Sequence, residues 1–156
     1  MAAGAMAGIP TFIPARVLGR EGAVAPSEKI NLGVIGIGPR CTYVLTSMLG
    51  LKDVRCVAIA DVQKSRREAG KALVDKLSGN NDCVLYRDMR EMLARKDIDA
   101  VVIATPDHWH ALNAIHAARA GKHIYCEKPL TRTVAEGRRL VTEVAKAKVT
   151  FQTGSQ

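Results

Sequence analysis

From residue 29 onward, short apolar runs alternate with longer segments that are apolar on one side only. The apolar runs predict strands over 30–36, 54–60, 83–86, 99–105, 122–126 and 149–152. Apolar positions at helical spacing predict helices over 39–49, 63–77, 88–95, 107–120 and 133–146. Asp88-x-x-Glu91 and Thr133-x-x-Glu136 have the spacing of capping boxes, and Asp107 is expected to cap the fourth helix.

Strands that alternate with helices predict parallel pairing, because right-handed crossovers place helices on both faces of one sheet. The expected fold class is therefore α/β, a Rossmann-type doubly wound parallel sheet. Ligands of such sheets bind beyond the carboxyl ends of the strands. The loops 36–41, 61–63, 105–110 and 127–129 lie at those ends, so we expect them to form one site.

Composition limits the class of partner. The 156 residues, 47% of them hydrophobic, suit one domain over 29–156. The formal net charge is +8, but the basic residues are dispersed and aromatic residues are few, so no nucleic-acid partner is expected. No apolar run has the length of a membrane span, so no membrane partner is expected. The spacing of the four cysteines fits neither zinc nor a disulfide scaffold and predicts buried free thiols.

Residues 1–28 form a leader of different character, rich in Ala, Gly and Pro and without periodicity. One interpretation is the remnant of an export signal whose basic first part is missing, which would place the protein in the periplasm after loss of a twin-arginine segment. The other is a flexible leader on a cytoplasmic protein. The sequence leaves both open.

Directly after the first strand, the loop GIGPR (36–40) has the pattern of a dinucleotide-binding turn. Gly36 suits the tight turn, and Gly38 lets the backbone approach a diphosphate. Cys41 replaces the third glycine of the pattern, whose task is close packing, so phosphate contact is spared. We expect cofactor contacts from Gly36, Ile37, Gly38, Pro39 and Arg40.

Asp61 follows the second strand, 25 residues beyond Gly36, where a ribose-binding acid is expected. A carboxylate accepts hydrogen bonds from both ribose hydroxyls and repels a 2′-phosphate, which favours NAD. Lys64, Arg66 and Arg67 act against this preference, so NADP stays an alternative. The other interpretation of Asp61 is a helix cap.

The segment ATPDHWH (104–110) follows the fourth strand. On a helix, His108 and His110 point away from each other and cannot share one ion, so no metal site is expected. His110 is expected to pack or hydrogen-bond near the cofactor, and Trp109 is expected to pack.

The segment YCEKPLT (125–131) follows the fifth strand. Lys128 is the candidate catalytic residue, because a lysine beside nicotinamide can hydrogen-bond a substrate hydroxyl and ease its proton away during hydride transfer. Glu127 would hold this lysine or contact the cofactor, and Pro129 would fix the turn through a cis bond. A surface ion pair explains the same residues equally well.

The segments VIGIGPR, AIADV, ATPDHWH, GKHIYCEKPL and TVAEGRRLV, in this order, resemble the N-terminal domain of the glucose–fructose oxidoreductase / inositol dehydrogenase / MocA family. The resemblance covers about residues 29–156 and implies an NAD(P)-dependent oxidoreductase of sugars or polyols. It also implies roles for particular residues. Gly36, Gly38 and the amides around Arg40 would bind the pyrophosphate, and Asp61 would bind the adenosine ribose. Thr105, Pro106 and His110 would line the nicotinamide side. Lys128 would contact the substrate, and Glu127 belongs to the signature.

Members of this family carry a second α/β domain, which supplies most substrate contacts, the usual catalytic histidine and the oligomer interface. The resemblance therefore implies an oxidoreductase domain that lacks its C-terminal partner, with low activity alone. A sugar or polyol substrate and an oligomer are expected only of the full-length enzyme. Three alternatives stay open: a stand-alone nucleotide-binding module without catalysis, a part of an NAD-dependent glycosidase, and a structural remnant that binds nothing.

Overall fold

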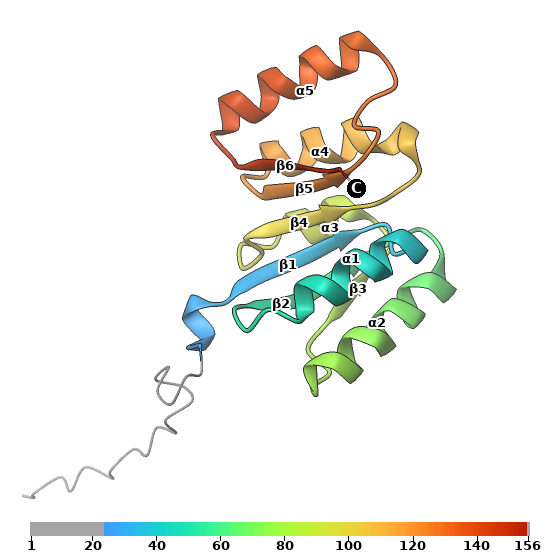
Figure 1. The fold of residues 1–156 in the computed structure, drawn as a ribbon, viewed down its shortest axis with the longest axis vertical. Helices are drawn as coiled ribbons and strands as arrows, with labels where there is room; N and C mark the ends of the chain where they lie inside the picture. Colours follow the sequence, from blue (N-terminus) through green and yellow to red (C-terminus); the bar gives the residue numbers. More distant parts are fainter. Residues whose placement is uncertain (1–23, 156) are drawn as a thin grey trace, which may run out of the picture.

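Six parallel strands form one sheet in the order β3-β2-β1-β4-β5-β6 in the computed structural model, which describes residues 24–155 (Figure 1). The strands are β1 (Ile30–Ile35), β2 (Val54–Ala60), β3 (Val84–Tyr86), β4 (Ala100–Ile103), β5 (His123–Glu127) and β6 (Phe151–Gly154). From β1 the chain winds outward to β3, then returns to pair β4 with β1 and winds the other way. The predicted doubly wound Rossmann-type sheet is confirmed.

Helices cover both faces of this sheet. They are α1 (Pro39–Leu49), α2 (Lys64–Ser78), α3 (Met89–Leu93), α4 (His110–Arg119) and α5 (Val134–Ala147). Figure 1 shows α1 and α2 in front of the sheet and α3 and α4 behind it, and α5 packs against α4. All crossovers therefore bring the loops after the strands to one end of the sheet.

Two predicted helix caps are wrong in detail. Residues Asp107–Trp109 form a 3-10 turn, η3, before α4, and Asp107 makes no side-chain cap there, because the tighter turn already begins at this residue. At α3, Asp88 caps the helix through the backbone amide of Arg90, and its carboxylate also binds the Arg90 side chain. The expected capping box with Glu91 is replaced by this local pair, whereas the box of Thr133 and Glu136 is confirmed.

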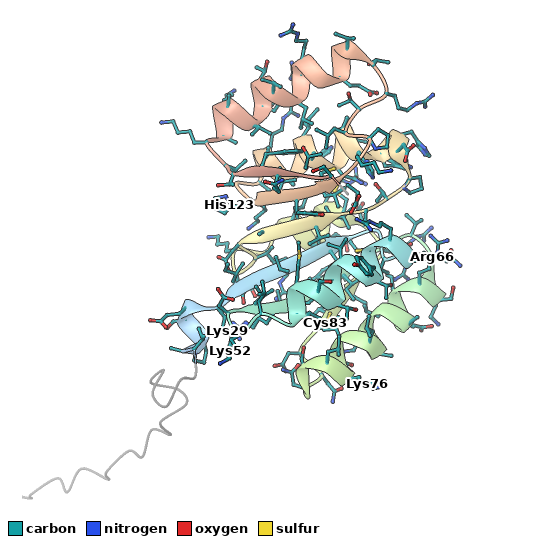
Figure 2. All side chains as sticks on the ribbon, viewed as in Figure 1. Lys29, Lys52, Arg66, Lys76, Cys83 and His123 are labelled. Carbon is teal, nitrogen blue, oxygen red and sulfur yellow. The ribbon has the colours of Figure 1, made fainter. Side chains whose placement is uncertain are left out.

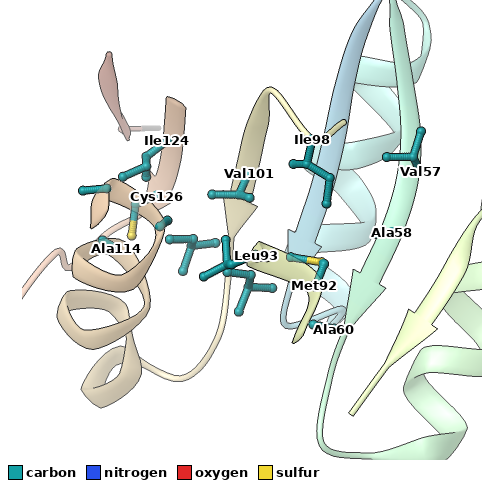
Figure 3. Packing of buried hydrophobic residues seen from close by; sticks show 14 of the residues in the cluster. Val57, Ala58, Ala60, Met92, Leu93, Ile98, Val101, Ala114, Ile124 and Cys126 are labelled. Carbon is teal, nitrogen blue, oxygen red and sulfur yellow. The ribbon is translucent and has the colours of Figure 1, made fainter. Parts of the chain in front are cut away.

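The core consists of two apolar layers, one on each face of the sheet. The layer under α1 and α2 includes Leu45, Ile59 and Val74. Figure 3 shows the other layer, in which Met92 and Leu93 of α3 lie beside Val101 of β4. All four cysteines are free and buried, as expected.

Little of the predicted leader can be compared with the structure, because residues 1–23 lie outside the described residues. Its last part forms a 3-10 turn, η2 (Pro26–Glu28), before β1. Between residues 24 and 155, no helix has both the length and the hydropathy needed to cross a bilayer. Basic side chains lie at both ends of the sheet, with Lys29 and Lys52 at one end and Arg66 at the other (Figure 2).

The buried layer under α1 gives a direct stability test. Leu45 is fully buried on α1, and Leu77 on α2 is 47% exposed. We expect Leu45→Ala to lower the free energy of unfolding by about 3 kcal/mol, because it removes apolar contacts and leaves a cavity. Leu77→Ala, which makes the same chemical change on a helix, is expected to cost less than about 1 kcal/mol. Urea unfolding of the two variants would contradict this core assignment if their midpoints shifted equally.

Candidate functional site

The loops after β1 and β4 touch at the point where the winding of the sheet reverses. Gly36 has φ +83°, and a Cβ there would lie 2.6 Å from Cγ2 of Thr105 and 2.9 Å from its Cα. Because the neighbour is backbone, it cannot move aside. Position 36 therefore requires glycine both for its conformation and for the space.

Gly38, in contrast, faces open space. A Cβ there would have one neighbour within 4 Å, Nη1 of Arg66 at 3.9 Å. Gly38 precedes α1, and Pro39 is the first residue of that helix. Within residues 24–155 the structure records no hydrogen bond to the backbone amides of Arg40 and Cys41. A backbone without Cβ beside free amides at a helix N-terminus suits a phosphate group.

Asp61 lies at the same loop, as the sequence predicts. Its Oδ2 accepts a hydrogen bond from the amide of Ile37 at 3.0 Å, and its Oδ1 accepts one from the amide of Gln63 at 2.8 Å. The N-cap of α2 is Gln63, so Asp61 is not the cap of that helix. The carboxylate instead ties the glycine loop to the loop after β2.

A cleft of about 840 Å³ opens beside Gly36, Gly38 and Asp61. Two arginines line it, Arg66 from α2 and Arg87 from the loop after β3, and residues 24–155 provide no ion pair for either of them. Arg90 also lines it but is engaged by Asp88, and its hydrogen bonds lower the pKa of Asp88 to about 2. The cleft thus combines one carboxylate near the glycine loop with two unpaired cations.

A second, smaller cleft of about 330 Å³ lies on the other side of Thr105. It shares Ala104 and Thr105 with the larger cleft. Its further lining residues are Arg40, Asp107, His110, Glu127 and Lys128. Nine of the eleven candidate residues line one of the two clefts, with Pro106 on the larger cleft and Lys128 on the smaller one. Ile37 and Pro39 line neither cleft, and the Ile37 side chain is buried in the core layer under α1.

His110 connects the loops after β4 and β5. The ring is 1% exposed, with Nδ1 2.7 Å from the carbonyl oxygen of Pro129 and Nε2 2.8 Å from that of Thr105. Both ring nitrogens therefore lie within hydrogen-bond distance of a backbone carbonyl oxygen, and the tautomer decides which nitrogen donates. The Lys128–Pro129 bond is cis, as expected. No cluster suited to a metal ion occurs among residues 24–155.

Glu127 is paired with Arg40 and not with Lys128. Its side chain is 5% exposed, and Oε1 accepts a hydrogen bond from Nε of Arg40 at 2.8 Å. Cys41 is buried nearby, and burial, followed by the charges of Asp61 and Glu127, raises the pKa of its thiol to about 12. The thiol is therefore neutral and serves packing, in line with the task of the glycine that it replaces.

Three residues of the site are absent from the sequence predictions or were placed wrongly. Trp109 was expected to pack, but it is 47% exposed and lines the larger cleft, because the 3-10 turn directs it away from the core. Arg87 directly follows β3, and this position at the carboxyl end of a parallel strand is the sequence signal that identifies it. Asn113, 4% exposed, donates a hydrogen bond to Oγ1 of Thr105, a contact without a sequence signal.

Comparisons with known proteins agree with this geometry. A family model described as "Oxidoreductase family, NAD-binding Rossmann fold" matches residues 30–155. Inositol 2-dehydrogenase 1 of Saccharopolyspora erythraea is 35% identical over 127 residues, which are 80% of this chain and 36% of that protein. A glycosyl hydrolase family 109 protein of a Shewanella species is 34% identical over 119 residues, 74% of this chain and 26% of that protein.

Among solved structures, the WlbA dehydrogenase of Bordetella pertussis, in complex with NADH and UDP-GlcNAcA, superimposes with a TM-score of 0.71 at 28% identity. The match covers 81% of this chain and 37% of that one. The chain thus spans about a third of the length of the proteins that it matches. It belongs to the glucose–fructose oxidoreductase / inositol dehydrogenase / MocA family and forms the NAD-binding Rossmann domain of an oxidoreductase.

Proposed function

We propose that the chain binds a nicotinamide dinucleotide across both clefts and serves hydride transfer to or from a hydroxyl group of a sugar or polyol. The observation that carries this proposal is that the two clefts share Ala104 and Thr105, while the glycine loop contributes Gly36 and Gly38 to the larger cleft and Arg40 to the smaller one. A dinucleotide has two ends joined by a diphosphate, and the site has two hollows joined by a loop suited to phosphate.

The larger cleft would hold the adenosine half. Asp61 is fixed by two backbone amides, so its remaining lone pairs can accept hydrogen bonds from the ribose hydroxyls. This favours NAD. Arg66 and Arg87 offer positive charge to a 2′-phosphate in the same cleft, which keeps NADP as a second cofactor. The backbone of residues 36–40 would contact the diphosphate.

The smaller cleft would hold the nicotinamide half. Thr105 and His110 would form one side of its binding site, and Glu127 and Lys128 the other, while Pro106 faces the larger cleft beside Thr105. When bound, the cofactor supplies the hydride acceptor or donor. Lys128 is exposed at the rim of the cleft, where its amine would hydrogen-bond the substrate hydroxyl and take up or return its proton.

The relatives, and not the clefts, support the proposed substrate class. Inositol 2-dehydrogenase acts, by its name, on a cyclic polyol, and WlbA holds a nucleotide-linked sugar derivative with NADH. We propose a sugar or polyol for this protein as well. Because the chain spans only 36% of the inositol dehydrogenase, substrate selection and oligomer formation would require residues beyond those matched here.

The single tryptophan of the chain gives a direct binding assay. Trp109 lines the larger cleft and is 47% exposed, so a bound dinucleotide would change its surroundings. We expect NADH to quench the fluorescence emission of Trp109 until the site is saturated. When Trp109 is excited, energy transfer should at the same time increase the fluorescence emission of the bound nicotinamide. NADPH serves as the comparison for cofactor preference. Unchanged emission of both fluorophores up to millimolar NADH and NADPH would contradict dinucleotide binding.

The two glycines of the loop separate folding from binding. Gly38→Ala adds a methyl group in open space at the N-cap of α1, where alanine is less favourable than glycine, so we expect the free energy of unfolding to fall by no more than about 1 kcal/mol. NADH affinity should fall at least about tenfold, because the methyl group occupies the path of the diphosphate. Gly36→Ala meets the backbone of Thr105 at positive φ and should destabilise the protein by about 2 kcal/mol or more. Equal NADH affinity of wild type and Gly38→Ala would place the diphosphate elsewhere.

A further inference from the structure

The Arg40–Glu127 ion pair connects the glycine loop with the end of β5. Arg40 stands in the first turn of α1, and Glu127 is the last residue of β5. They are 87 positions apart, yet Nε of Arg40 lies 2.8 Å from Oε1 of Glu127. Both side chains line the smaller cleft. The pair therefore contributes opposite charges to the wall of that cleft.

Packing holds Glu127 in place, whereas the Arg40 side chain is 41% exposed. The Glu127 carboxyl group lies against β6, where a Cβ at Gly154 would come within 2.9 Å of Cδ of Glu127. The Arg40 guanidinium lies 5.4 Å from the centroid of the Tyr43 ring on its other side, in cation–π range. If Arg40 turned away to a phosphate, it would leave a buried carboxylate without its cation, which is costly. The geometry thus favours a pair that stays intact.

We propose that the Arg40–Glu127 pair keeps the smaller cleft close to electrically balanced and thereby sets its relative affinity for oxidised and reduced cofactor. This inference rests on the proposed binding of nicotinamide in that cleft. The oxidised nicotinamide ring carries a positive charge and the reduced ring is neutral. A net negative wall stabilises the oxidised form, and a net positive wall stabilises the reduced form.

The other charged groups at this cleft make the balance sensitive to the pair. Lys128 adds a positive charge and Asp107 a negative one, and both are exposed to solvent, which screens them. His110 is buried between two carbonyl oxygens. Glu127 is the buried carboxylate among the lining residues, so its neutralisation by Arg40 has the largest electrostatic effect.

The test is the ratio of the dissociation constants of NAD⁺ and NADH, measured by calorimetry on the full chain at pH 8. Arg40→Gln leaves an unbalanced carboxylate, so the ratio should fall about three- to tenfold, in favour of NAD⁺. Glu127→Gln leaves an unbalanced guanidinium, so the ratio should rise by a similar factor. The double variant, which has a neutral pair, should return to within about twofold of the wild type. Arg40→Lys keeps the charge and should also stay within about twofold.

Arg119→Gln is the control outside both clefts, because it removes an arginine from the nearly buried Glu143 between α4 and α5, although Glu143 keeps Arg139 as a second partner. It should lower stability and leave the ratio unchanged. If Arg40→Gln and Glu127→Gln weakened both cofactor forms equally, or shifted the ratio in the same direction, the pair would be structural and the inference would be overturned. If the wild type bound neither form, the proposed function itself would fail, which is a different result.

Discussion

The site depends on one steric constraint, the direct contact between the loops after β1 and β4. The two strands are neighbours in the sheet, and Gly36 meets the backbone of Thr105 with no room for a side chain. This contact brings the two clefts together and turns the glycine loop toward both of them. Asp61 then fixes the loop from the side of β2 through the amide of Ile37. The cofactor site is therefore a consequence of strand order, to which the side chains add specificity.

Much of this arrangement could be predicted from the sequence, because parallel strands must present their carboxyl ends on one side. The order of apolar runs was sufficient to place Gly36, Asp61, His110 and Lys128 in four loops that meet in the structure. The start of α4 was harder to predict from the sequence, since Asp107 fits a helix cap and a 3-10 turn equally well. Trp109 followed this error, because its direction depends on the type of turn.

The partner of Arg40 could not be predicted for a different reason. An arginine after a glycine loop suggests a phosphate contact, and its long side chain reaches several acceptors. Arg40 pairs with Glu127 because of the way in which β5, β6 and α1 pack together, including the absence of a side chain at Gly154. Sequence motifs identify the members of a site, whereas packing between distant segments decides which of them neutralise each other.

Cys41 shows how the one departure from the dinucleotide pattern affects the chemistry of the whole protein. Because burial raises the pKa of this thiol to about 12, it stays protonated at neutral pH, so peroxides and electrophiles find almost no thiolate in the cofactor loop. Burial also raises the pKa of Cys126 to about 12. Cys83 is the exception, because a hydrogen bond from Cys56 lowers its pKa. Cys83 precedes β3, at the end of the sheet away from the cofactor loop, and it is itself buried, so the thiols of this protein are shielded from oxidants on both sides of the sheet.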